Sequence, residues 1–204
     1  MSAQPGQRRL RLLVVGVGGQ GALTAARFAG EACLHAGHEV MVSQLHGMSQ
    51  RGGSVECAVL IGAGESAFVG DGQADVVLAL EPLEALRARP QMSAETTVVV
   101  SRGTIVPFPL AQRGESYPPV DGILDQLREV TPRVHELDAA TLAQRAGAPR
   151  SLNAVMVGAL GALELLPVTA EALLEAVSLG SPARFRDINR RAFELGGEAI
   201  SPRA

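Results

Sequence analysis

The chain has 204 residues, a formal net charge of −3 and basic residues that are all arginine. Without lysine it has no Schiff-base lysine, no P-loop lysine and no lysine general base. The acidic balance argues against a nucleic-acid or anionic-membrane partner, and a single tyrosine with no tryptophan argues against an aromatic platform for single-stranded nucleic acid. The length suits one α/β domain, with room for a short helical extension.

The two cysteines, Cys33 and Cys57, are too few and too far apart for the usual cysteine chemistry. An iron–sulfur cluster takes four cysteines, and two cannot form a disulfide framework. The apolar run after the first arginines is too short for a signal peptide, and the stretch 152–168 is too interrupted to span a bilayer. We therefore expect a soluble protein of the reducing cytoplasm.

Apolar runs and turn residues predict a single domain at residues 10–200 behind a flexible tail at 1–9. Asp138 and Ser181 are predicted N-caps, and 103–119, with its four prolines, is predicted to be an irregular arm. Alternating strands and helices predict a Rossmann-like, doubly wound, mostly parallel α/β sheet with C-terminal helices. The predicted strands are 10–15, 39–43, 54–61, 75–80, 97–101 and 133–137, and the predicted helices are 22–36, 83–89, 122–130, 138–146, 152–166, 169–177 and 182–200.

The segment Gly16-x-Gly18-x-x-Gly21 lies between a predicted strand and a predicted helix, which is the setting of a dinucleotide fingerprint. That fingerprint also needs an acidic residue at the end of the second strand, to bind a ribose hydroxyl. Here the acid, Glu39, stands at the start of that strand, which is predicted to end at Ser43. Bound NAD is therefore disfavoured. A purely structural turn and a contact to an anion or cofactor remain equally open.

The segment Gln44-Leu-His-Gly-Met-Ser-Gln-Arg-Gly-Gly53 is more unusual, because it combines several reactive side chains. His46, Ser49, Gln50 and Arg51 offer a titratable ring, a hydroxyl, an amide and a guanidinium, and the two glycines free backbone N–H groups. The segment leaves the carboxyl end of a strand, where open α/β sheets place their ligands. The alternative is a polar crossover loop whose arginine pairs with a nearby carboxylate.

Two further patterns are weaker. The run Cys33-x-His35-x-x-His38 is spaced like metal ligands, but Cys33 falls on the packing face of its helix, so a core cysteine and two surface histidines are favoured. Glu81 follows the fourth strand and could contact a ligand or a partner subunit. An acid at a helix N-terminus is the simpler interpretation of Glu81.

These segments together resemble a known family. Val15-Gly-Val-Gly-Gly-Gln-Gly21 and His46-Gly-Met-Ser-Gln-Arg-Gly-Gly-Ser-Val55 resemble the γ-type domain of the 2-oxoacid:ferredoxin oxidoreductases. Later segments are similar too, namely 74–85, the helix opened by Asn153, and Asn189 with Phe193 and Gly196. The resemblance covers about residues 10–200, and the His-Gly-Met-Ser-Gln-Arg-Gly-Gly form is typical of the indolepyruvate branch.

The resemblance implies the accessory β subunit of an indolepyruvate (aryl-pyruvate) ferredoxin oxidoreductase. Such a complex decarboxylates a 2-oxo acid oxidatively with CoA, forms an acyl-CoA and passes electrons to ferredoxin. The implied partner is a large α subunit that carries thiamine diphosphate, Mg and [4Fe–4S] clusters, and the αβ units are expected to dimerise. No cofactor is expected on this chain alone, and no nucleic acid or membrane is an expected partner.

By the same resemblance, this chain docks on the catalytic subunit and helps to wall the active site or the CoA path. His46 and Arg51 are the candidates for a catalytic role, and no metal ligand is expected. Two alternatives stay open: the γ subunit of a related pyruvate, 2-oxoglutarate or phenylglyoxylate enzyme, and an independent nucleotide-binding Rossmann module. The residues predicted to face a cofactor are Gly18, Gly19, Gln20, Gly21, Met48, Gln50 and Arg51.

Overall fold

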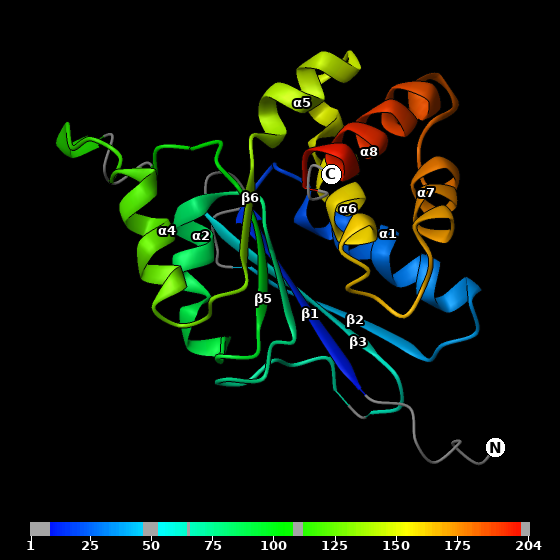
Figure 1. Ribbon diagram of the computed structural model, residues 1–204, viewed down its shortest axis with the longest axis horizontal. Helices are drawn as coiled ribbons and strands as arrows, with labels where there is room; N and C mark the ends of the chain where they lie inside the picture. Colours follow the sequence, from blue (N-terminus) through cyan, green and yellow to red (C-terminus); the bar gives the residue numbers. More distant parts are fainter. Residues whose placement is uncertain (1–8, 47–52, 65, 108–111, 201–204) are drawn as a thin grey trace.

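The computed structural model describes residues 9–46, 53–64, 66–107 and 112–200, which form a central sheet with helices on both faces (Figure 1). Within these residues six strands make one sheet in the order β2-β3-β1-β4-β5-β6. The fold is thus the predicted doubly wound α/β sheet. The strands are β1 (Leu10–Val17), β2 (Val40–His46), β3 (Ser54–Ile61), β4 (Val76–Ala79), β5 (Thr97–Ser101) and β6 (Val134–Leu137).

Five of these strands run in one direction. β1, β4, β5 and β6 pair in parallel, whereas β3 is antiparallel to both β1 and β2. Since β3 alone is reversed, β2 has the direction of β1 although it lies one strand further out. The prediction of a mostly parallel sheet is confirmed, and a hairpin-like wing of β2 and β3 extends one side of it.

The helices divide unequally between the two faces (Figure 1). α2 and α4 cover the face beside β1, β4, β5 and β6, and α1, α6 and α8 lie on the other face, with α5 and α7 packed outside them. The bounds are α1 (Ala22–His35), α2 (Pro82–Arg87), α4 (Val120–Arg128), α5 (Ala139–Ala146), α6 (Leu152–Ala162), α7 (Ala170–Leu179) and α8 (Arg186–Ile200), with short 3-10 turns η1 (Arg89–Gln91), η2 (Pro149–Ser151) and η3 (Ala183–Phe185).

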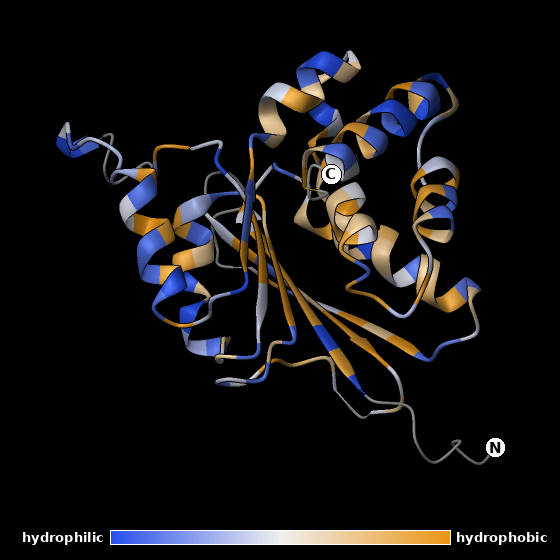
Figure 2. Ribbon diagram, in the orientation of Figure 1, coloured by the Kyte–Doolittle hydropathy of each residue, from blue (hydrophilic) through white to orange (hydrophobic). Residues whose placement is uncertain are grey.

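Strand β1 contributes side chains to the hydrophobic core on both faces of the sheet. Leu12 and Val14 belong to the cluster shared with α1 and α6, and Leu13 and Val15 belong to the cluster shared with α2 and α4. A strand buried on both faces needs a continuous apolar run, because successive side chains point in opposite directions. Figure 2 shows the result as hydrophobic strands between helices whose outer faces are hydrophilic.

Helices α6 and α8 cross in close contact at two glycines. A Cβ on Gly158 would lie 2.0 Å from the carbonyl oxygen of Phe193, and one on Gly196 would lie 1.9 Å from that of Val155. Real side chains do not approach a backbone oxygen so closely, so both positions require glycine. This crossing holds α8 against the most apolar helix of the core.

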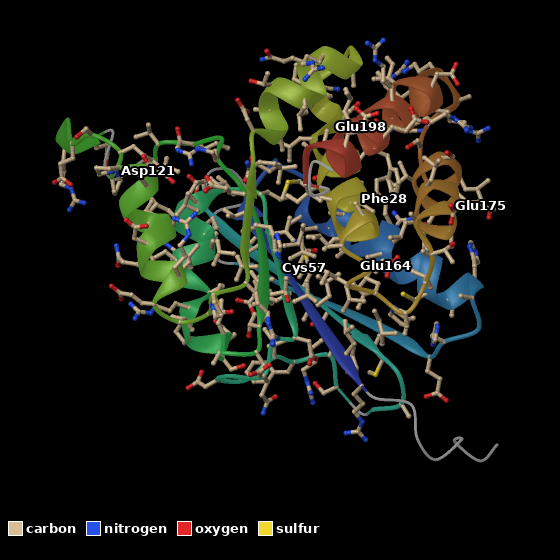
Figure 3. All side chains as sticks on the ribbon, viewed as in Figure 1. Phe28, Cys57, Asp121, Glu164, Glu175 and Glu198 are labelled. Carbon is tan, nitrogen blue, oxygen red and sulfur yellow. The ribbon has the colours of Figure 1, made fainter. Side chains whose placement is uncertain are left out.

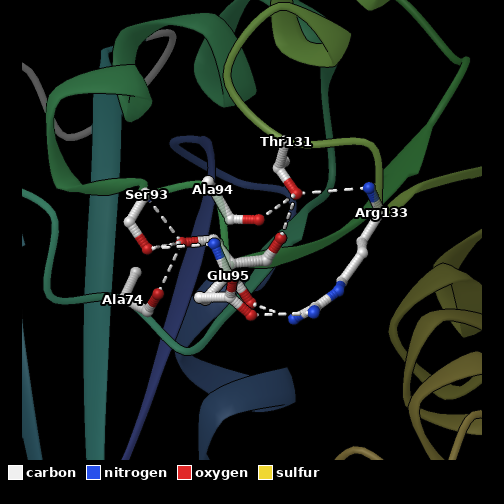
Figure 4. A network of polar contacts seen from close by, with 7 residues as sticks. Ala74, Ser93, Ala94, Glu95, Thr131 and Arg133 are labelled. Atoms are coloured by element: carbon white, nitrogen blue, oxygen red, sulfur yellow. Dashed lines mark hydrogen bonds and ion pairs between the residues drawn. The ribbon is translucent and has the colours of Figure 1, made fainter.

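Polar side chains brace the amino ends of β4, β5 and β6 (Figure 4). Thr96 Oγ1 donates a hydrogen bond to the carbonyl of Ala74 at 2.6 Å, and Thr131 Oγ1 donates to the carbonyl of Thr96 at 2.7 Å. On the surface beside them Arg133 pairs with Glu95 at 2.8 Å. These hydrogen bonds lie at the amino edge of the parallel strands. The loops that carry the candidate residues lie at the opposite, carboxyl edge.

Several predicted element bounds were wrong, and two corrections matter for function. β1 runs through Val17 rather than stopping at 15, because Gly16 and Val17 pair with β3. β2 covers Val40–His46 rather than 39–43, because Gln44, Leu45 and His46 continue its ladder with β3. Residues 44–46, predicted to open the polar loop 44–53, therefore belong to β2.

The C-terminal helices also differ from prediction. α6 ends at Ala162 rather than 166, and the predicted helix 182–200 is the turn η3 followed by α8. Ser181 is not its N-cap, because its buried hydroxyl donates to the carbonyl of Val177 at 2.5 Å. The Asp138 cap is confirmed: its carboxylate accepts from the Thr141 N–H at 3.0 Å, and this hydrogen bond lowers the pKa of Asp138.

No helix within the described residues is both long and apolar enough to cross a membrane.

Candidate functional site

The glycine turn joins β1 to α1 at the carboxyl edge of the sheet. Gly19 and Gly21 have φ angles of +104° and +83°, which glycine adopts without strain. Gly21 is the N-cap of α1, and neither a capping side chain nor an acidic residue stands in the first turn of that helix. The positive end of the α1 dipole is therefore not neutralised by its own helix, and an anion beside it would be stabilised.

Gln20 braces this turn from within. Its Oε1 accepts the Val17 N–H at 2.7 Å, and its Nε2 donates to the carbonyl of Leu80 at 3.1 Å. Both polar atoms of the side chain are thus used inside the chain. Gln20 was predicted to face a cofactor, and the structure places its amide between the turn and the residue that follows β4.

The glycine turn and the end of the motif segment meet in space. The Gly18 N–H donates to the carbonyl of Gly53 at 2.8 Å. On the outer side of this contact, Gln44 and Val55 line a hollow of about 350 Å³ with Gly18, Gly19 and Gly21. His46 is the last residue of β2. Its side chain and the residues Met48, Ser49, Gln50 and Arg51 lie outside the described part of the chain.

A second cleft, of about 620 Å³, opens on the other side of the turn. Gly19, Gln20 and Gly21 form one wall, and Thr104, Arg150 and Asn153 contribute to the others. The same glycine turn therefore separates two hollows, and both are within reach of the N-terminus of α1.

Asn153 is one of the residues of this cleft that were not predicted as site residues. Its side chain is only 9% exposed, and a Cβ on Gly21 would lie 2.4 Å from its Nδ2. Among the described residues its buried Oδ1 has no hydrogen-bond partner. The sequence signals for it were an asparagine in the first turn of an otherwise apolar helix and its place in a segment that resembles the family, and its neighbours become visible only in three dimensions.

The topology explains why the dinucleotide fingerprint is incomplete. In a dinucleotide-binding domain the acid that holds the ribose ends the strand next to β1. Here β3 separates β2 from β1. An acid at the end of β2 would stand one strand too far away, and β2 carries none.

The buried carboxylate of Glu81 binds residues of the irregular segment 103–119, beside the second cleft. Glu81 is 1% exposed and caps α2 by accepting the Glu84 N–H at 3.1 Å, as predicted for a helix N-terminal acid. It also accepts the Tyr117 hydroxyl at 2.5 Å and the Ile105 N–H at 3.3 Å. Burial and the neighbouring Glu81 raise the pKa of Tyr117. The carboxylate thus ties the irregular arm to the end of β4.

A second buried carboxylate fastens the start of β3. Ser54 Oγ donates to Glu84 at 2.5 Å, and Arg87 donates to the other oxygen of that carboxylate. Glu84 is 2% exposed, and burial raises its pKa. Since Ser54 directly follows Gly53, this pair fixes the exit of the motif segment against α2.

Residues 11–199 match the family described as pyruvate ferredoxin/flavodoxin oxidoreductase. The chain belongs to this family. The family resemblance stated from the two motifs is thereby confirmed, and chains of the family are subunits or domains of an oxidoreductase complex.

Two curated relatives and one solved structure show how close the similarity is. The chain is 42% identical to the indolepyruvate oxidoreductase subunit IorB of Methanothermobacter thermautotrophicus over 91% of this chain and 94% of that protein. It is 40% identical to IorB of Archaeoglobus fulgidus over 96% and 98%. The γ subunit of a keto/oxoacid ferredoxin oxidoreductase from Geobacter sulfurreducens has the same fold, with a TM-score of 0.68 and 24% identity over 94% of this chain and 98% of that one.

The described residues contain no group of histidine, cysteine or acidic side chains that could hold a metal ion. Burial raises the pKa of the Cys33 thiol to about 12 and that of the Cys57 thiol to about 11, so neither is a ready thiolate ligand. Cys33 lies in the core, as predicted, and a ring nitrogen of His38 is 3.0 Å from the carbonyl of Pro167.

Proposed function

We propose that this chain is the β subunit of an indolepyruvate:ferredoxin oxidoreductase. The observation that carries the proposal is the similarity to IorB proteins along almost their whole length. The segment from His46 to Gly53, in the form typical of the indolepyruvate branch, supports the same substrate. The complex would convert an aryl-pyruvate and CoA into an aryl-acetyl-CoA and CO2, with ferredoxin as the electron acceptor.

The proposal assigns the redox and carbanion chemistry to a large α subunit. Thiamine diphosphate, Mg and the [4Fe–4S] clusters would all be held there. The buried cysteines, and the lack of a metal-binding group among the described residues, support this division. The αβ units are proposed to pair in the assembled enzyme.

The part proposed for this chain is to complete the wall of the active site. Gly18, Gly19 and Gly21 present backbone and the positive end of α1 to the two hollows, which favours an anionic group of CoA or of the acid there. Met48, Gln50 and Arg51 are proposed to face the same site, with His46 and Arg51 as the candidates for a catalytic role. Gln20 would contribute indirectly, because its two hydrogen bonds hold the glycine turn in place.

The edge strand β2 supports a permanent contact near this site. Met41, Val42 and Leu45 are exposed there, with exposed fractions of 38%, 42% and 54%. Exposed apolar residues on an unpaired strand edge mark a surface that another chain covers. Because β2 leads into His46 and the motif, we propose that the large subunit covers this edge.

The test is reconstitution with a candidate large subunit from the same organism. A tagged chain should recover an iron–sulfur partner, and the complex should reduce ferredoxin with indole-3-pyruvate and CoA. Activity only with pyruvate, 2-oxoglutarate or phenylglyoxylate would assign the chain to another branch of the 2-oxoacid oxidoreductase family. Recovery of the chain as a free monomer would contradict the subunit role.

The variant Arg51→Ala tests the proposed site in the same complex. It should lower turnover more than assembly, whereas the control Arg27→Ala, which removes a surface arginine paired with Glu31 on α1, should change neither. Unchanged turnover of an intact Arg51→Ala complex would leave Arg51 with a structural role only.

A further inference from the structure

The thirteen described arginines from residue 27 onward fall into two groups that differ in their partners. Between residues 27 and 133, each described arginine forms an ion pair with a carboxylate. Six later arginines are exposed and form no ion pair within the described part of the chain. The paired group is Arg27, Arg87, Arg89, Arg102, Arg113, Arg128 and Arg133. The unpaired group is Arg145, Arg150, Arg184, Arg186, Arg190 and Arg191.

The unpaired arginines come from elements that lie together. α5 lies beside α8 (Figure 1), and η2 and η3 both contact α8 as well. A Cβ on Gly147, which follows α5, would lie 3.8 Å from Ile188 in the first turn of α8. We call the exposed surface formed by Arg145, Arg150, Arg184, Arg186, Arg190 and Arg191 the arginine surface.

A hollow of about 160 Å³ lies within this surface. Arg150, Pro182, Phe185 and Asn189 line it. The guanidinium of Arg184 lies 5.0 Å from the centre of the Phe185 ring, which favours a cation–π contact. These side chains give the arginine surface a concave, partly apolar centre.

Hydrogen bonds to Ser181 also restrain two side chains at the rim of this hollow. Arg186 Nε donates to the carbonyl of Ser181 at 3.4 Å, and Asn189 Nδ2 donates to Ser181 Oγ at 2.7 Å. Guanidinium groups held in this way lose less conformational entropy when they meet an anion.

The positive charge of α8 is concentrated in its first six residues, whereas two of its three carboxylates lie further along. Helix α8 carries Asp187 among its first arginines and Glu194 further along, and Figure 3 shows Glu198 near its C-terminal end. The first six residues of α8 thus hold three arginines and one aspartate, in a chain whose net charge is −3. Such a local excess attracts an acidic partner over a longer range than a single contact does.

We propose that the arginine surface is the docking site of the acidic protein that carries electrons away from the complex, which is ferredoxin if the proposed function holds. A permanent subunit interface has an apolar core depleted of charge. In this chain the exposed apolar strand edge is β2, whereas the arginine surface is charged. Electron-carrier complexes are small, transient and steered by charge, which suits unpaired arginines around a shallow hollow. Nucleic acid fits less well, because the chain as a whole is acidic and has no tryptophan.

The test uses the assembled complex with the triple variant Arg184→Gln, Arg190→Gln and Arg191→Gln. At low ionic strength, kcat/KM for ferredoxin should fall about tenfold, mainly through KM, and its salt dependence should become shallower. Turnover with a small dye such as methyl viologen should stay unchanged, because the dye needs no docking surface. The matched control is Arg27→Gln, Arg128→Gln and Arg133→Gln, which removes the same charge from paired positions and should change kcat/KM less than about twofold.

A conservative variant separates charge from folding. Changing the same three positions to lysine keeps the charge and should restore most of the ferredoxin kinetics. If the glutamine variant does not fold, Arg190→Gln alone should still weaken ferredoxin kinetics by about twofold to threefold.

Other outcomes would overturn the proposal. Unchanged ferredoxin kinetics in an intact triple variant would do so. Loss of the large subunit from the variant would assign the arginine surface to subunit assembly, and tighter binding of RNA than of ferredoxin would assign it to nucleic acid. Direct binding of ferredoxin to the immobilised complex needs no turnover, so the docking surface can be tested even if the complex oxidises no aryl-pyruvate.

Discussion

The side-chain amide of Gln20 donates a hydrogen bond to the carbonyl oxygen of Leu80 at 3.1 Å. The same amide accepts from the Val17 N–H at 2.7 Å. Gln20 thus links the glycine turn that begins α1 to Leu80, the residue that follows β4. Because the turn lines both hollows of the candidate site, this link makes the shape of the site depend on a side chain that need not touch a ligand.

Gln20→Ala should destabilise the chain and disturb the turn. It leaves the Val17 N–H and the Leu80 carbonyl without their partner, and a partly buried polar group without a hydrogen bond costs about 1–3 kcal/mol. Denaturant unfolding should show this loss. The control Gln44→Ala truncates an exposed glutamine on β2 and should leave the free energy of unfolding almost unchanged. Equal stability of the two variants would contradict the bracing role.

Adjacent glycines on α8 should respond oppositely to alanine. Gly196→Ala places a methyl group 1.9 Å from the carbonyl oxygen of Val155, so α6 and α8 must separate, at a cost of about 1–3 kcal/mol or more. Gly197→Ala meets nothing nearer than 3.6 Å and should stabilise the helix by about 0.5–1 kcal/mol. Thermal unfolding of both variants checks this. A tolerated Gly196→Ala would mean that the helices do not cross so closely.

The pH dependence of stability should contain a contribution from Glu84. Burial raises its pKa above the ordinary 4.5 in the folded chain, so the folded state holds more protons than the unfolded state just above that pH. The free energy of unfolding should therefore fall as pH rises through this window. Glu84→Gln should make that fall smaller, with the contribution of Glu56 remaining because burial raises its pKa too. Glu175→Gln, at an exposed position on α7, should leave the fall unchanged. Identical pH profiles for Glu84→Gln and the parent would contradict the raised pKa.

Both thiols should be unreactive while the chain is folded. The raised pKa values, about 12 for Cys33 and about 11 for Cys57, leave almost no thiolate at about pH 8. A thiol-specific dye should label neither in the native chain and both after denaturation. Rapid labelling of one cysteine in the native chain would contradict the burial of its thiol.

The sequence predicted best those elements whose pattern is local. The bounds of β3 were predicted as observed, because Val55, Cys57, Val59 and Ile61 alternate between two glycine-containing segments. β2 was predicted too short, because Gln44 and His46 are polar. Gln44 is nevertheless held in the sheet by its register opposite Cys57. An edge strand of this kind is stabilised by its neighbour rather than by its own composition.

Relationships that depend on tertiary packing were not predictable from one sequence. The position of β3 between β1 and β2 is set by a non-local pairing. The same is true of the approach of Asn153 to Gly21, since it joins two elements that the sequence pattern treats separately. Of the candidate site, the glycine turn and the meeting of its two loops could be anticipated, whereas the inward amide of Gln20 could not.

The most direct test of the account is the substrate profile of the reconstituted complex. With CoA and ferredoxin present, CO2 release from indole-3-pyruvate should exceed release from pyruvate and 2-oxoglutarate, and it should disappear when this chain is omitted. Full activity of the large subunit alone, or a preference for a non-aromatic acid, would contradict the assignment.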